Sequence, residues 1–108
     1  MIKIKVPKQI KIGTHSYIVG FSKILRADEG LSGMTHHRRQ EIDIESILPV
    51  SQKDVTLLHE VLHIIDRKYK CELGEDNVCR VAEGVAEFLF NNLGITLDWG
   101  DIIERKED

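Results

Sequence analysis

The sequence predicts an α+β domain, in which a small, mostly antiparallel N-terminal sheet packs on one long helix and a following C-terminal helix. In the first half of the chain, apolar and polar residues alternate in short segments, which is the strand pattern. In the second half, apolar residues recur every three or four positions, which is the helix pattern. The chain has 108 residues, 42% of them hydrophobic. We therefore expect a single domain over residues 1–108, with one modest core.

Five short segments of the first half are candidate strands. Pro7 ends the first of them, because proline cannot donate to a strand ladder. The segments on either side of Gly13 are expected to pair as a hairpin, and the last two flank a turn at 36–40. Residues 22–26 are expected to form a short helix and residues 28–30 a turn. The candidate strands cover residues 2–6, 10–12, 15–21, 31–35 and 41–45.

The last candidate strand alternates most clearly. Ile42 and Ile44 point to one face, whereas Glu41, Asp43 and Glu45 point to the other. This pattern predicts a half-buried strand whose acidic face is solvated.

A long helix is expected from about Ser51 to Tyr69. Ser51 is a favourable N-cap residue, and Asp54 follows three positions later as a weak capping-box partner. The apolar stripe of this segment is broad, which predicts a largely buried helix.

A second helix is expected over residues 75–92, ending before Gly94. Beyond it, residues 95–100 are expected to dock on the domain and residues 104–108 to fray. The apolar positions that define the second helix are Val78, Val81, Ala82, Val85, Phe88 and Leu89.

Composition argues against some classes of function. The net charge of −3 and the pI of about 5.9 are unlike those of general nucleic-acid binders. The one basic cluster, residues 36–39, is short and is interpreted as a turn between strands. Residues 2–6 alternate and do not resemble a signal peptide, and no segment approaches the length of a membrane span. We therefore expect a soluble, cytoplasmic protein that binds neither nucleic acid nor membrane.

The sequence His59-Glu60-Val61-Leu62-His63 carries the clearest chemical signal. Histidines four apart lie one turn above each other on one helix face, so both imidazoles can reach one zinc ion. The side chain of Glu60 projects about 100° away from that of His59. It can therefore act as a general base on an activated water without ligating the metal. The alternative is a pair of neutral core histidines beside a surface glutamate.

A catalytic zinc site usually has three protein ligands and one open position. Helical projection favours Glu75 as the third ligand, because it falls on the inward stripe of the second helix. If the two helices were strictly antiparallel, Glu83 would lie closer than Glu75 to the level of His63 along the helix axis. Glu83 is therefore the alternative. Otherwise Glu75 is a solvated residue whose negative charge stabilises the N-terminus of the helix. The candidates from which Glu75 is chosen are Glu75, Asp76, Glu83 and Glu87.

Asp66 lies three residues after His63 and is a candidate to hydrogen-bond the free ring nitrogen of a ligand histidine. A surface aspartate is the equally weighted alternative. Stabilisation of an oxyanion needs a further donor. The sequence does not choose among the candidates, which are His15, Tyr17, His36, His37 and Tyr69.

The chain resembles the small zincin-type metallopeptidases of phage and prophage genomes, which are similar to the ImmA/IrrE family. The resemblance is strongest over residues 56–66 and continues through residues 75–78 and 81–85. It implies a minimal zincin-like fold, with His59 and His63 as zinc ligands and Glu60 as the general base. It also implies a glutamate as third ligand, at the start of a pattern that begins here at Glu75.

Three functions compete. The first is a zinc metallopeptidase that hydrolyses a peptide or protein substrate, held as an added strand along residues 40–45. The second is a structural-zinc module that uses both histidines with Cys71 and Cys79. Otherwise these cysteines are interpreted as reduced thiols, with Cys79 partly buried. The third is a degenerate zincin fold that binds a partner without turnover. Manganese or cobalt also suits the same ligands.

Overall fold

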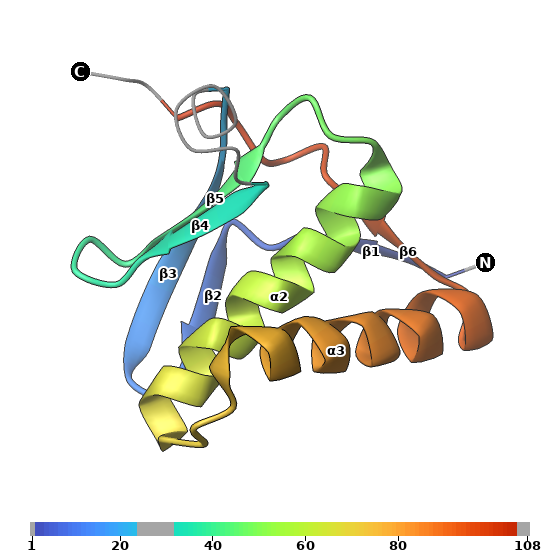
Figure 1. Cartoon of the computed structure of the whole chain (residues 1–108). Helices are drawn as coiled ribbons and strands as arrows, with labels where there is room; N and C mark the ends of the chain where they lie inside the picture. Colours follow the sequence, from blue (N-terminus) through green and yellow to red (C-terminus); the bar gives the residue numbers. More distant parts are fainter. Residues whose placement is uncertain (1, 24–31, 106–108) are drawn as a thin grey trace.

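The structure is a computed structural model, and it describes residues 2–23 and 32–105. Two sheets and two long helical segments make up this part of the chain (Figure 1). One sheet has four strands in the order β2-β3-β5-β4, and the other pairs β1 with β6. The bounds are β1 Ile2–Lys5, β2 Gln9–Ile12, β3 His15–Ser22, β4 Gly33–His36, β5 Glu41–Glu45, α2 Val50–Tyr69, α3 Gly74–Ala86 and β6 Ile95–Asp98. A π-helical segment, Glu87–Asn92, continues α3.

Helix α2 lies across one face of the four-stranded sheet, and α3 packs against α2 (Figure 1). Ile42 and Ile44, in the central strand β5, are completely buried. Leu57 and Ile64, two turns apart on α2, belong to the same cluster. The core therefore forms between the middle of the sheet and the buried stripe of α2, as expected for a half-buried helix.

The α+β class and the hairpin of β2 and β3 are confirmed. The expectation of a mostly antiparallel sheet holds for two of its three pairings, because β3 and β5 run parallel. β1 leaves this sheet and pairs in parallel with β6, in the segment expected only to dock. Residues 24–26 of the expected short helix and the turn at 28–30 lie outside the described residues, and Ser22 belongs to β3.

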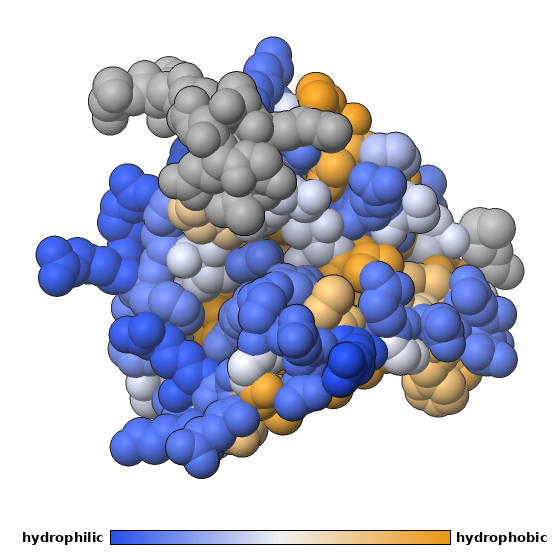
Figure 2. Space-filling model, viewed as in Figure 1, coloured by the Kyte–Doolittle hydropathy of each residue, from blue (hydrophilic) through white to orange (hydrophobic). Residues whose placement is uncertain are grey.

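Helix α3 buries a narrower stripe than its sequence predicts. Val78, Ala82 and Ala86, each four positions apart, are buried. Val85 and Phe88, both expected to face inward, are 36% and 57% exposed. Apolar surface is accordingly visible along α3 in Figure 2. The helix touches α2 along one edge only, so a single row of small residues is sufficient for the contact.

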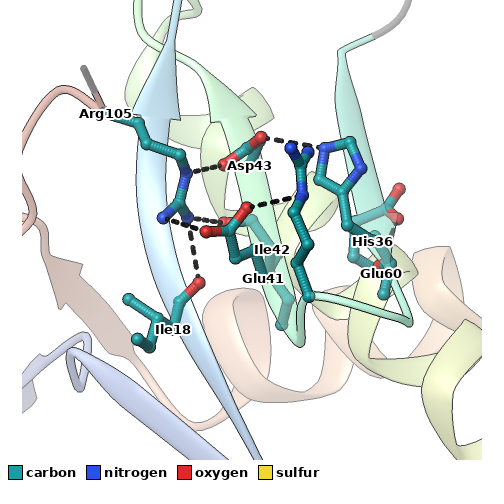
Figure 3. Close-up of polar contacts among 9 residues, drawn as sticks. Ile18, His36, Glu41, Ile42, Asp43, Glu60 and Arg105 are labelled. Atoms are coloured by element: carbon teal, nitrogen blue, oxygen red, sulfur yellow. Dashed lines mark hydrogen bonds and ion pairs between the residues drawn. The ribbon is translucent and has the colours of Figure 1, made fainter. Parts of the chain in front are cut away.

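The acidic face of β5 is buried, and the prediction that it is solvated is wrong. Asp43 is 5% exposed and Glu45 is 1% exposed. Arg105, expected to lie in a frayed tail, covers this face instead (Figure 3). Its guanidinium pairs with the Asp43 carboxylate, lies 3.3 Å from Glu41 Oε2 and donates to the carbonyl of Ile18 at 3.0 Å. This charged donor offsets the cost of burying Asp43, whereas Glu45 Oε1 has no hydrogen-bond partner among the described residues.

Gly20 leaves the space for this arginine. A Cβ atom at Gly20 would lie 2.8 Å from Arg105 Nη2, closer than such contacts normally occur. The other side of Asp43 faces His36, whose Nε2 lies 3.1 Å from Asp43 Oδ2. Asp43 is therefore enclosed between Arg105 and His36 on the face of the sheet away from α2.

The start of α2 also differs from the prediction. The helix begins at Val50 with Pro49 at the cap, and no side chain caps it. The carbonyl of Pro49 accepts from the amides of Gln52 and Lys53, both at 3.0 Å. Asp54 does not form a capping box. It is buried, and its Oδ1 accepts a hydrogen bond of 2.7 Å from the Trp99 indole.

Burial raises the pKa of Asp54 above its usual value of 3.8, while the Trp99 hydrogen bond and the charge of Lys53 act in the opposite direction. A raised carboxyl pKa means that the folded state favours the protonated form. The contribution of this group to stability is therefore largest below pH 3.8 and falls as the pH rises towards the pKa of the folded state.

We predict that Asp54→Asn is at least as stable as the wild type at pH 7, because the amide oxygen still accepts from Trp99 without carrying charge. The advantage should shrink as the pH is lowered through this window. Urea unfolding, followed by circular dichroism between pH 3 and 7, measures the difference. Asp101→Asn, at an exposed carboxylate, is the control. A stability difference for Asp54→Asn that does not vary with pH would contradict the prediction.

Candidate metal centre on helix α2

The structure brings three metal-ligating side chains together at one point. His59 and His63, one turn apart on α2, place their Nε2 atoms 3.0 Å from each other. Glu75, in the first turn of α3, lies with Oε1 2.9 Å from His59 Nε2 and Oε2 2.7 Å from His63 Nε2. This is the only such group of three among residues 2–23 and 32–105.

These separations suit a small divalent cation. Zinc bonds nitrogen and oxygen at about 2.0–2.1 Å, so ligand atoms at the corners of a tetrahedron are roughly 3.3 Å apart. The three observed separations are a few tenths of an ångström shorter. A slight outward movement of the side chains would therefore accommodate an ion. The Glu75 side chain is 66% exposed, against 20% for His59 and 30% for His63. The most exposed side of the group lies near Glu75, and a fourth coordination position on that side would face solvent.

A short turn between the helices places Glu75. Lys70 and Gly74 adopt positive φ angles of 52° and 80°, and these reverse the chain after α2. The Asp66 carboxylate accepts the amide of Leu73 at 3.0 Å. The structure thus gives Asp66 a different contact from the expected one to a ligand histidine, since its carboxylate holds the turn that carries Glu75.

The other ligand candidates lie elsewhere. Glu83 lines a cavity of about 290 Å³ beside the centre but does not belong to the three-residue group. The strictly antiparallel arrangement that would favour Glu83 is not observed, because α3 diverges from α2 after the turn (Figure 1). Cys71 and Cys79 are free and exposed, so the expected partial burial of Cys79 is wrong. In the described chain neither cysteine joins the histidines.

Glu60 lies beside the histidines, about 100° around the helix from His59 and about 60° from His63. Its residue is only 7% exposed, and its Oε1 accepts a hydrogen bond of 2.8 Å from Thr35 Oγ1. Thr35 belongs to β4, so strand and helix meet at this carboxylate. Sequence reasoning did not identify Thr35, because nothing local marks a threonine in one strand as the partner of a distant glutamate.

A cleft of about 300 Å³ runs between β4 and the centre. Gly33, Met34 and Thr35 line one side, and the candidate ligands and Glu60 line the other. β4 is an edge strand of the described sheet, whereas β5 is paired on both sides. The prediction that residues 40–45 form the substrate edge is therefore wrong, and the edge strand that lines this cleft is β4.

Three of the residues considered for oxyanion stabilisation lie away from the cleft. His36 faces Asp43 on the side of the sheet away from α2. His15 Nδ1 lies 3.1 Å from Gln40 Nε2. Tyr69 is 62% exposed at the end of α2.

Tyr17 and His37 lie closer to the candidate centre. The Tyr17 hydroxyl is 3.5 Å from His37 Nδ1. Burial, followed by the positive charge of Arg67, lowers the pKa of His37 from its usual value of 6.5. Both effects favour the neutral ring.

Comparisons with protein-family models, with curated proteins and with solved structures found no match. In the described residues, no helix has both the length and the apolar character needed to cross a membrane.

Gly33 controls how closely β4 approaches α2. A Cβ atom there would lie 2.6 Å from Thr56 Cγ2 and 3.3 Å from Glu60 Cγ. We predict that Gly33→Ala lowers the free energy of unfolding by about 1–3 kcal/mol through overpacking. Urea unfolding followed by the fluorescence of Trp99, the single tryptophan, measures this loss.

Thr56→Ser removes the nearest clashing carbon and provides the control. In the double variant, the cost of Gly33→Ala should be markedly smaller than in the wild-type background. If Gly33→Ala lowered the free energy of unfolding equally in both backgrounds, the loss would not come from a clash between residue 33 and Thr56.

Proposed function

We propose that this protein is a zinc-dependent metallopeptidase with a glutamate general base. The observation that carries the proposal is the convergence of His59, His63 and Glu75, with Glu60 buried beside them and outside the ligand group. A zinc ion bound there supplies Lewis-acid chemistry, polarising a carbonyl and lowering the pKa of a water molecule to about 7.

Glu60 supplies the proton transfers. Its carboxylate accepts the proton of the attacking water and then delivers it to the amine that leaves. The Thr35 hydroxyl occupies Oε1, so Oε2 is the oxygen available for this exchange. The hydrogen bond also fixes the carboxylate against β4, which holds the base in one orientation.

The edge of β4 suits an extended peptide. A peptide added along this edge would satisfy backbone groups that are unpaired within the described sheet. Because Gly33, Met34 and Thr35 line the same cleft as the candidate ligands, one peptide bond of the added strand would lie over the centre.

The test measures zinc content and peptidase activity together. The wild type should bind about one zinc ion per chain and cleave an unfolded, fluorescently labelled protein. Glu60→Gln should keep the zinc and lose roughly 10²–10⁴-fold in activity. Glu75→Gln should lose zinc. Asp76→Asn, on the same helix but outside the ligand group and outside both cavities beside it, is the matched control and should change neither property.

Two results would favour the competing functions. Zinc that is lost when Cys71 and Cys79 are both changed to serine, but kept in Glu75→Gln, would identify a structural-zinc module. Zinc bound through the histidines with no cleavage by the wild type would leave a non-enzymatic binding protein. Manganese or cobalt in place of zinc would alter the assigned metal and not the ligands.

We predict that Thr35→Val keeps the bound zinc but lowers kcat by about tenfold, because the loss of one hydrogen bond to a charged acceptor frees the base to rotate. Thr35→Ser should restore most of the activity. Steady-state kinetics on a neutral peptide, with zinc content measured in parallel, gives the comparison. A change confined to KM would instead assign Thr35 to substrate binding.

A further inference from the structure

A basic cavity of about 520 Å³ lies at the C-terminal end of α2. It opens between α2, the start of β3 and the turn that joins β4 to β5. No residue of the described chain that lines it is acidic. The lining residues on which the inference depends are Tyr17, His37, Arg38, Arg67 and Lys68. Hydrophilic surface gathers over this end of α2 and over the β4–β5 turn in Figure 2.

The three cations reach the cavity from separate parts of the chain. Arg67 and Lys68 belong to the last turn of α2, where positive charge also favours the helix C-terminus. Arg38 comes from the β4–β5 turn and has no such role. Within residues 2–23 and 32–105, none of the three pairs with a carboxylate, although the neighbouring Arg39 pairs with Glu41 at 3.3 Å. Cations that face one cavity without counter-charges favour an anion there.

The cavity adjoins the candidate metal centre. Glu60, His63 and Arg67 follow one another along α2, three or four residues apart, on nearly the same side of the helix. β4 runs beside them in the same direction: Gly33 lies against Thr56, Thr35 bonds Glu60, and His37, just after β4, lines the same cavity as Arg67. Arg67 is about 6 Å beyond His63 along the helix, so an extended peptide that follows α2 from the centre would reach the level of the basic cavity within about two residues.

The opposite end of the cleft has the reverse character. The cavity of about 290 Å³ beside Gly33 is lined by the carboxylates of Glu60, Glu75 and Glu83 and by no basic residue other than His59. A bound peptide would thus meet acidic groups at one end and basic groups at the other. This polarity orients a substrate that carries one negative charge.

We propose that the cavity of Arg38, Arg67 and Lys68 is a substrate subsite that binds a carboxylate within two residues of the scissile peptide bond. The inference rests on the proposed peptidase function and adds the class of substrate, a peptide with an acidic group at that position. The Tyr17 hydroxyl and the neutral His37 ring supply uncharged donors beside the three cations. The carboxylate comes either from an aspartate or glutamate side chain or from the C-terminus of the peptide.

Matched peptides test the proposal in the zinc-loaded full chain. In the first pair, a peptide with glutamate next to the cleaved bond is compared with the same peptide carrying glutamine. In the second pair, a peptide whose free C-terminal carboxylate lies at that position is compared with the same peptide ending in a C-terminal amide. The wild type should cleave the charged member of one pair with a kcat/KM about 10- to 100-fold higher. The pair that shows the difference identifies the source of the carboxylate. Equal values within both pairs would overturn the proposal.

Charge removal localises the effect. In a variant carrying Arg38→Gln and Arg67→Gln, the preference should fall to near one while zinc content and cleavage of the neutral peptide persist. Arg80→Gln, an exposed arginine of α3 that lines neither cavity, is the control and should keep the preference. A preference that survives in the double variant would place the anion site elsewhere.

A second measurement separates this inference from the proposed function. If the zinc-loaded wild type cleaves nothing, binding of the same peptide pairs is followed by fluorescence anisotropy. If the charged peptide binds more tightly than its neutral counterpart, and this difference disappears in the double variant, the carboxylate site is supported. Equal binding of the charged and neutral peptides would overturn it. Inorganic phosphate that displaces the peptide at far lower concentration than acetate would reassign the cavity to phosphate.

Discussion

The close approach of strand β4 to helix α2 at Gly33 is the constraint on which the candidate site depends. Because this residue has no side chain, Thr56 and Glu60 of α2 occupy the space where a Cβ atom would lie. The approach brings the Thr35 hydroxyl within 2.8 Å of Glu60. In the neighbouring strand, the large side chains of Ile42 and Ile44 fill the wider gap under the helix. The absence of a side chain at Gly33 thus allows β4 to approach α2 closely at the edge of the sheet.

The part of the site that could be predicted from sequence is the part that local geometry determines. His59 and His63 share a helix, so their alignment follows from the helical repeat alone. Glu75 follows after a short turn, and its projection onto the second helix is enough to prefer it over Glu83. The divergence of the helices was not predictable, because it depends on the backbone of residues 70–74 and on the contact of Asp66 with the turn.

The features that sequence reasoning missed are those whose partners lie far along the chain. Alternation over residues 41–45 reveals which side chains share a face but not which strands lie on either side. It therefore did not distinguish an edge strand from the central strand that β5 proves to be. The same pattern describes an acidic face covered by water and one covered by Arg105. Asp54 likewise matched a capping box locally, while its actual partner, Trp99, is distant in sequence.

Four carboxylates of the described chain are buried, and they differ in the donor that each one receives; Glu45 Oε1 receives none among the described residues. Asp43 has a guanidinium as partner, and Asp54 has an indole N–H inside the core. Glu60 receives a hydrogen bond from a neutral hydroxyl and lines the cleft beside the candidate ligands. A neutral partner orients a carboxylate without competing for its charge, and the open cleft gives a water molecule access to it. Of these buried carboxylates, Glu60 is the one that lines the cleft beside the candidate ligands.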